Sequence, residues 1–74
     1  MPFVTVRITR EGASAEQKAR IIAEMTETLR SVLGKNPTTT HVVIEEVDTD
    51  NWGVGGLPCL DYRARQNPAG NAQT

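Results

Sequence analysis

The sequence predicts an α/β (α+β) fold: a single β-α-β unit with two parallel strands, assembling into an oligomer. Three observations lead to this prediction. Apolar residues alternate over 3–9, β-branched residues dominate 41–47, and between these segments apolar residues recur with a helical period. About 30 residues that include a helix separate the two strands, which favours a right-handed crossover between parallel neighbours.

The first predicted strand covers residues 3–9. Val4, Val6 and Ile8 fall on one face, because successive side chains of a strand point to opposite sides of the sheet. The opposite face begins with Phe3. A single helix can cover only one of these faces, so we expect the face with Phe3 to need a partner.

The predicted helix begins at about Ala15 and ends before Gly34. Ser14 and Gln17 match the capping box, in which the two residues satisfy free helix N–H groups reciprocally. Gly34 suits the left-handed conformation that often closes a helix, and Pro37 cannot readily continue one. The apolar stripe expected to cover the sheet consists of Ala15, Ala19, Ile22, Met25, Leu29 and Val32.

The chain changes character after the second predicted strand at 41–47. Residues 48–51 have the composition of a turn, and the W-G-V-G-G segment at 52–56 is expected to be punctuated by glycine rather than to form a regular element. The polar end of the chain predicts a mobile C-terminal tail over 66–74. Residues 1–65 then form one domain.

The chain is too short to bury a large core. A domain of about 60 residues buries only about 60% of the surface that its unfolded chain exposes. Cys59 is the single cysteine and His41 the single histidine, so neither an intrachain disulfide nor a structural zinc site can supplement the core. We therefore expect a homo-oligomer with an active site between chains.

Composition excludes several classes of partner. Eight basic and nine acidic residues give a formal net charge of −1, so no basic surface is expected for nucleic acid. No stretch approaches the roughly 20 apolar residues that span a bilayer, and the N-terminus lacks a signal-peptide pattern. We expect a cytoplasmic protein that acts on a small molecule and contacts neither membrane nor nucleic acid.

Pro2 is the most unusual candidate for chemistry. Removal of Met1 would leave a secondary amine at the start of a buried strand. An α-amino group has a pKa of about 7.7–8.0, and an apolar site lowers this pKa toward neutrality, where a base can remove a proton next to a carbonyl. The residues alone leave open whether Pro2 is a base or only a permissive second residue. A thiolate pair between Cys59 and His41 is a weaker alternative.

From Pro2 to about Gly56 the chain resembles the 4-oxalocrotonate tautomerase family. The resemblance rests on an ordered set of short motifs, each weak when taken alone. These are Met1-Pro2 before the first strand, Glu11-Gly12 followed by Ser14-x-Glu16-Gln17-Lys18, a second strand ending in Glu46, and Trp52-Gly53-Val54-Gly55-Gly56.

The resemblance implies an isomerase, a keto-enol tautomerase of small unsaturated 2-hydroxy or 2-oxo acids of the kind met in aromatic degradation. Pro2 would be its general base once Met1 is removed. Trp52 matches an aromatic residue that lines the family's site, where its indole would exclude water and keep the amine neutral; alternatively, Trp52 only closes a hairpin. The resemblance also implies a homohexamer built from dimers, with a trimer or dimer as alternatives, and no metal or organic cofactor.

Two positions depart from the family pattern. Ala13 and His41 stand where the best-known members carry arginines that bind the substrate carboxylate and polarise its carbonyl. Alanine offers no donor, and histidine is only partly charged at neutral pH. We expect Arg10 and His41 to bind the substrate in their place. Three other arginines are less favoured substitutes: Arg7, Arg63 and Arg65.

These departures keep two other functions open. The proline amine could serve a hydratase-like or dehalogenase-like reaction, or form an imine with a carbonyl compound. The chain could also be a catalytically silent subunit used for assembly or small-molecule binding. A panel of substrates and the replacement of Pro2 distinguish these possibilities.

Overall fold

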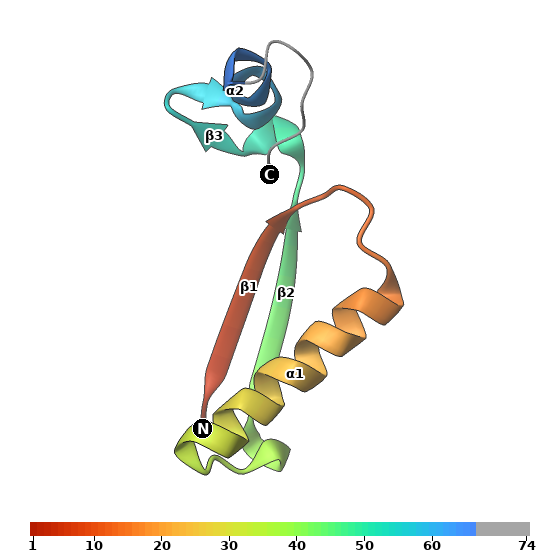
Figure 1. The fold of residues 1–74 in the computed structure, drawn as a ribbon, viewed down its shortest axis with the longest axis vertical. Coiled ribbons are helices and arrows are strands. Elements are labelled where there is room, and N and C mark those ends of the chain that lie inside the picture. Colours follow the sequence, from red (N-terminus) through yellow and green to blue (C-terminus); the bar gives the residue numbers. More distant parts are fainter. Residues whose placement is uncertain (67–74) are drawn as a thin grey trace.

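The computed structural model describes residues 1–66 of the 74-residue chain. Figure 1 shows an elongated molecule, with extents of 46 × 22 × 21 Å, in which a β-α-β unit is followed by a smaller C-terminal unit. The helices and strands are β1 (Phe3–Thr9), α1 (Ala15–Leu33), β2 (His41–Val47), β3 (Gly53–Val54), β4 (Leu57–Pro58) and α2 (Cys59–Gln66), and two 3₁₀ turns are η1 (Pro37–Thr39) and η2 (Thr49–Asn51).

The β-α-β prediction is confirmed. β1 and β2 are parallel, and their register runs from Phe3 opposite His41 to Thr9 opposite Val47. Because the strands are parallel and in register, both begin at one end of the sheet and both finish at the other. This arrangement decides which candidate site residues can meet within one chain.

The ends of α1 are also as predicted. The Ser14 hydroxyl accepts a hydrogen bond from the backbone N–H of Gln17 at 3.1 Å, and the Gln17 side chain accepts one from the backbone of Ser14 at 2.9 Å. These reciprocal bonds form a capping box. At the other end Gly34 adopts φ +69°, the left-handed conformation that glycine takes most readily, and its N–H bonds to the helix carbonyls.

The predicted sheet-covering stripe of α1 is only partly correct. Leu29 is half-buried, but the other members of the stripe are exposed: Ile22 (41%), Met25 (37%), Val32 (72%), Ala15 and Ala19. Two strands are too narrow to cover the whole stripe, so its margins and its C-terminal end extend past the sheet. Lys18 and Ile21, which the stripe omitted, are half-buried, and Lys18 pairs with Glu46 near the end of β2.

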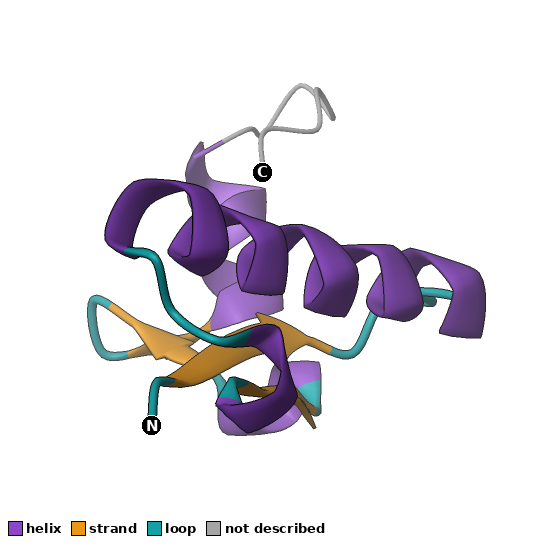
Figure 2. Ribbon diagram, turned by 90° about the horizontal axis from the view of Figure 1, so that it is seen from below, coloured by secondary structure: helices purple, strands orange, loops and turns teal. Residues whose placement is uncertain are grey.

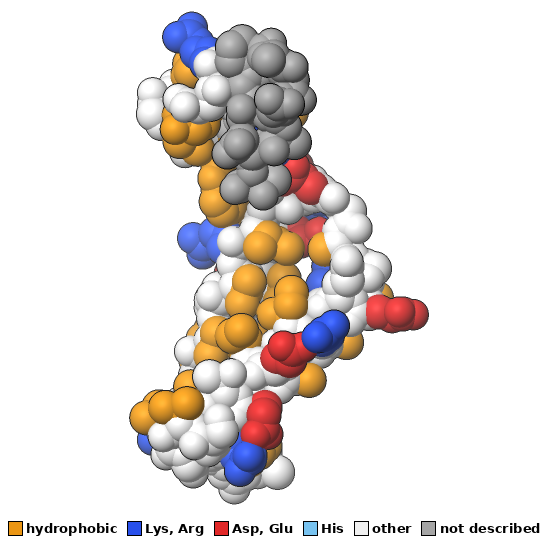
Figure 3. Space-filling model, in the orientation of Figure 1, with side chains coloured by type: hydrophobic (Ala, Val, Ile, Leu, Met, Phe, Trp, Pro, Cys, Tyr) orange, Lys and Arg blue, Asp and Glu red, His pale blue; other side chains and the backbone are white. Residues whose placement is uncertain are grey.

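α1 lies on one face of the β1–β2 sheet (Figure 2). The other face carries Phe3, 66% exposed, and Val43, 39% exposed, so the expectation of an uncovered face is confirmed. Even the helix-side face is incompletely covered, since hydrophobic atoms remain visible over the strands beside α1 in Figure 3. Within residues 1–66, no helix combines the length and apolar character needed to cross a membrane.

The C-terminal unit corrects our expectation for residues 52–56. Instead of an irregular segment, Gly53–Val54 pairs with Leu57–Pro58 in an antiparallel hairpin, and Gly55 and Gly56 make the turn at φ +60° and +85°. A two-residue turn with positive φ at both positions matches the right-handed twist of paired strands.

The hairpin leads directly into α2, which we did not predict. Cys59, the first residue of α2, is 3% exposed, and its N–H bonds to the carbonyl of Trp52 at 2.7 Å. Gln66, assigned to the tail from the sequence, is the last residue of α2. The rest of the predicted tail, 67–74, lies outside the described residues.

Candidate active site

Pro2 and His41 lie together at the amino-terminal end of the sheet. Pro2 immediately precedes β1 and is half-buried, and its carbonyl accepts a hydrogen bond from the backbone N–H of His41 at 3.0 Å. Met1 precedes it outside the strand and is 88% exposed. The position of Pro2 is thus set by the first hydrogen bond between the two strands, whereas Met1 contributes little packing.

The His41 side chain is exposed at the start of β2. His41 pairs in register with Phe3, so both side chains belong to the sheet face that α1 does not cover. Within residues 1–66 the imidazole makes no hydrogen bond with another side chain or with the backbone. It is free to donate to or accept from a group that approaches this end of the sheet.

Arg10 lies at the opposite end, immediately after β1. Its backbone N–H donates to the carbonyl of Val47 at 2.7 Å, which extends the strand pairing by one residue. Its side-chain Nε donates to Asp48 Oδ1 at 2.9 Å, and its Nη2 donates to the carbonyl of Glu46 at 3.5 Å. The Arg10 side chain is 60% exposed.

Trp52, like Arg10, lies beyond the carboxyl-terminal end of the β1–β2 sheet. It is half-buried and follows η2, and its N–H donates to the carbonyl of Thr49 at 3.3 Å. The N–H of Cys59 bonds back to the Trp52 carbonyl, which ties the tryptophan to the start of α2. The backbone of Trp52 is therefore fixed from both sides.

The structure separates the predicted site residues into two groups. Pro2 and His41 occupy the start of the parallel strands, while Arg10 and Trp52 come after their ends (Figure 1). Pro2 and Arg10 flank the seven residues of β1, so the two groups are about 26 Å apart at the rise of a strand. A small acid cannot contact both groups within a single chain.

Two of the less favoured arginines already have partners. Arg7 Nε donates to Glu45 at 2.9 Å on the uncovered sheet face. Arg63 donates to Glu11 through two nitrogens, at 2.6 and 3.0 Å. Hydrogen bonds from Arg63 and from the Thr9 hydroxyl, together with the charge of Arg63, lower the pKa of Glu11 to about 2.

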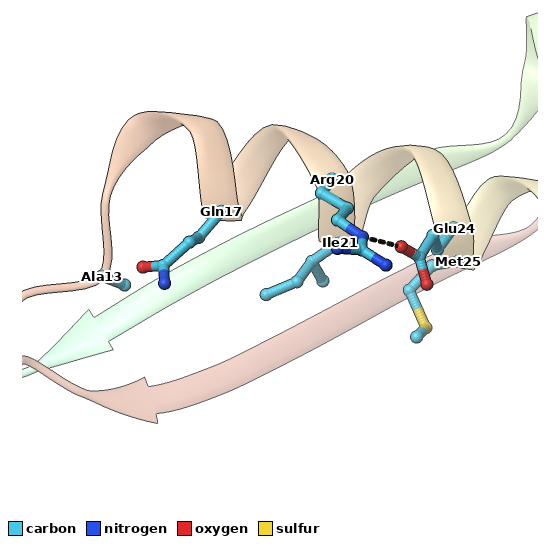
Figure 4. Close-up of a pocket in the computed structure, with 6 residues that line it drawn as sticks. All are labelled: Ala13, Gln17, Arg20, Ile21, Glu24 and Met25. Carbon is cyan, nitrogen blue, oxygen red and sulfur yellow. Dashed lines mark hydrogen bonds and ion pairs between the residues drawn. The ribbon is translucent and has the colours of Figure 1, made fainter.

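Ala13, in the loop between β1 and α1, lines a groove of about 410 Å³ along α1 (Figure 4). The figure shows Arg20 and Glu24 as an ion pair in the groove, with Ile21 and Met25 extending from the same helix. None of Pro2, His41, Arg10 and Trp52 lines this groove. It is a surface of α1, and we do not assign the chemistry to it.

The sequence reasoning missed Asp48 as a partner of Arg10. The signal was present in the strand register, because Thr9 opposite Val47 brings the following residues, Arg10 and Asp48, next to each other. It also missed the link between Glu11 and Arg63. That link depends on α2, an element that the sequence did not predict.

Comparisons with known proteins identify the class to which this fold and N-terminus belong. Residues 2–61 match the model of the family described as tautomerase enzyme. Probable tautomerase K2 of Dickeya dadantii is 61% identical over 63 residues, which cover 85% of this chain and 94% of that protein.

Solved structures agree with this match. The crystal structure of DmpI from Helicobacter pylori has a TM-score of 0.78 and 34% identity, and the alignment covers 84% of this chain and 96% of that one. A heterohexameric 4-oxalocrotonate tautomerase from Chloroflexus aurantiacus has a TM-score of 0.75 and 25% identity, covering 85% of this chain and all of that one.

The chain belongs to the tautomerase family, as a member similar to 4-oxalocrotonate tautomerase. Family membership supports a tautomerase-type activity and therefore an isomerase.

Proposed function

We propose that the protein is a keto-enol tautomerase of small unsaturated 2-hydroxy or 2-oxo acids, with Pro2 as its general base. The observation that carries the proposal is the anchored N-terminus. Pro2 is held by His41 at the start of β1, directly behind an exposed Met1, in a chain of the tautomerase family. Removal of Met1 converts an amide nitrogen into an amine with an available lone pair.

The amine of Pro2 would remove a proton from the substrate hydroxyl or from an activated carbon and return it at another position. The negative charge that develops on the substrate between these steps needs a donor aimed at it. Arg10 and His41 are the candidate donors, and the guanidinium of Arg10 can bind one carboxylate through two parallel hydrogen bonds. Trp52 would shield the amine from water, which favours its neutral form.

We propose that the site forms between copies of the chain, as part of a homohexamer. Pro2 and His41 of one copy would meet Arg10 and Trp52 of another, because the length of β1 keeps the two groups apart within one chain. The uncovered sheet face with Phe3 and the exposed end of α1 with Val32 supply apolar surface for assembly. The heterohexameric relative supports an assembly of this size.

The test is the replacement Pro2→Ala, with intact mass measured first to establish that Met1 is absent. We expect kcat for 2-hydroxymuconate or phenylenolpyruvate to fall about 100-fold or more, in the range that general acid–base catalysis contributes. Circular dichroism and sedimentation of both proteins check that fold and assembly are unchanged. Equal turnover by the two proteins, or turnover by neither, would contradict the proposal.

A matched protein with one extra residue before Pro2 provides a second control. Its proline nitrogen is an amide, so it should be as inactive as Pro2→Ala although the ring is still present. Activity on a haloacrylic acid but on neither enol would instead assign the amine to dehalogenase-like chemistry.

A further inference from the structure

The end of the β1–β2 sheet holds an ion pair between Arg10 and Asp48, and the proposed reaction so far gives Asp48 no role. Arg10 and Asp48 are the residues that follow the last register pair, Thr9 and Val47. The Arg10 N–H bonds to the Val47 carbonyl at 2.7 Å, and Arg10 Nε bonds to Asp48 Oδ1 at 2.9 Å. Backbone and side chain of Arg10 are thus both held by the segment that leaves β2.

The contacts of Arg10 use one edge of its guanidinium. Nε donates to Asp48, and Nη2 donates to the Glu46 carbonyl at 3.5 Å. A guanidinium carries five N–H donors in a planar fork, so its end edge, formed by Nη1 and the second hydrogen of Nη2, is still available. No residue in 1–66 accepts a hydrogen bond from Nη1. An edge of this kind binds a carboxylate through two parallel hydrogen bonds.

Asp48 also begins the turn that leads to Trp52. Its carbonyl accepts the N–H of Asn51 at 2.8 Å, and the Thr49 carbonyl accepts the N–H of Trp52 at 3.3 Å. The side chain of Asp48 therefore fixes the direction of Arg10, while its backbone starts the short turn η2 that places Trp52. Asp48 thus links Arg10, the candidate carboxylate-binding residue, to Trp52, the candidate apolar wall of the site.

We propose that Asp48 is a positioning residue, which holds the guanidinium of Arg10 with its Nη1–Nη2 edge directed at a substrate carboxylate. The inference rests on the proposed function and assigns a substrate-orienting role to a residue that touches no substrate. The pair is largely exposed, with side-chain exposures of 60% and 63%, and exposed ion pairs contribute little energy on their own. We therefore expect Asp48 to act by orienting Arg10 rather than by adding stability, and we expect only a modest effect on substrate binding.

A competing role for Asp48 predicts an effect of opposite sign. If Asp48 only neutralised Arg10, removing its charge would strengthen the attraction for an anionic substrate and KM would fall. If Asp48 orients Arg10, removing the acceptor frees the side chain to rotate and KM rises. Asp50 provides the matched control, because it lies in the same turn and makes no side-chain hydrogen bond within residues 1–66.

The experiment compares Asp48→Asn with Asp50→Asn on an anionic enol substrate. We expect Asp48→Asn to raise KM about threefold to tenfold with kcat within about twofold of the parent, and Asp50→Asn to leave KM unchanged or slightly lower it. Asp48→Glu, which keeps the acceptor on a longer arm, should restore part of the loss. An Asp48→Asn enzyme whose KM equals or falls below that of Asp50→Asn overturns the inference while leaving the role of Pro2 intact.

A titration that needs no turnover separates this inference from the proposed function. Adipate is a saturated dicarboxylate that cannot tautomerise, and its affinity for the assembled parent protein, Arg10→Ala, Asp48→Asn and Asp50→Asn can be measured by calorimetry. We expect binding to weaken about threefold to tenfold in Asp48→Asn and at least as much in Arg10→Ala. Equal affinities across the four proteins, or absence of binding, would overturn the inference even if Pro2 proves catalytic.

Discussion

The two ends of the β1–β2 sheet are built in different ways. At the amino-terminal end, Pro2 and His41 are joined by a backbone hydrogen bond, and the imidazole makes no contact of that kind within residues 1–66. At the carboxyl-terminal end, Arg10 and Glu11 are fixed by ion pairs with Asp48 and Arg63. The difference teaches that one end is held by its backbone alone and the other by paired side-chain charges, so a change of side chain should disturb the two ends in different ways.

Mixing two inactive variants tests this separation with the largest expected effect. Pro2→Ala and Arg10→Ala subunits are each expected to be nearly inactive, but unfolding and refolding them together should restore activity. If each site takes Pro2 from one copy and Arg10 from another, about one quarter of the sites in an equal mixture carry both native residues. The activity of the mixture is measured against the parent protein at the same concentration.

The control is a mixture of each variant with itself, refolded in the same way. A mixed sample no more active than these controls would place both residues of a site in the same copy. That result would contradict the site between chains, because β1 holds Pro2 and Arg10 at opposite ends of a single chain.

His41→Ala tests the amino-terminal end of the sheet, with a smaller expected effect. The backbone N–H that anchors Pro2 remains, so only the imidazole is lost. We expect KM to rise about threefold to tenfold, as for loss of one exposed hydrogen bond to a charged group, with a smaller change in kcat. Lys35→Ala, which removes another exposed basic side chain, is the matched control. Equal KM values for the two variants would remove His41 from the site.

Glu11→Gln tests the ion pair at the other end and has the smallest expected effect, a few degrees in Tm at fixed protein concentration. The pKa of Glu11 is lowered from 4.5 to about 2 in the folded chain. Its contribution to stability is therefore fully present above pH 4.5 and is lost as the pH falls toward 2. The Tm difference between parent and variant should follow that course. A difference that is constant with pH would mean that the carboxylate charge is not its cause.

The β-α-β unit could be predicted from the sequence because each element carries a local signal. Alternation defines β1, and the capping box of Ser14 and Gln17 with Gly34 defines both ends of α1. The exposure of the apolar residues of α1 could not be predicted from a local signal of this kind. It depends on how wide a sheet α1 covers, and residues such as Val32 extend beyond two strands.

The C-terminal unit was predicted less well, although signals were present. Gly55-Gly56 between Val54 and Leu57 is a two-residue hairpin turn, but strands of two residues are too short to show alternation. α2 begins at Cys59, directly after Pro58, without a capping motif of the kind that marks the start of α1. Among the residues of the proposed site, Pro2, Arg10, His41 and Trp52 were named from the sequence. The role proposed for Asp48 became visible only from the register of β1 and β2, which places it beside Arg10.

The hydrogen bond from His41 to Pro2 gives the proposed base a fixed place at the start of the sheet. The bond fixes which residue of the chain begins the sheet, and Met1 outside it is 88% exposed. One codon inserted between the first two would leave every strand and helix unchanged and still replace the amine with an amide. If Pro2 is the base that we propose, an affinity tag placed before residue 2 should abolish activity, whereas a tag placed after residue 74 should leave the amine intact.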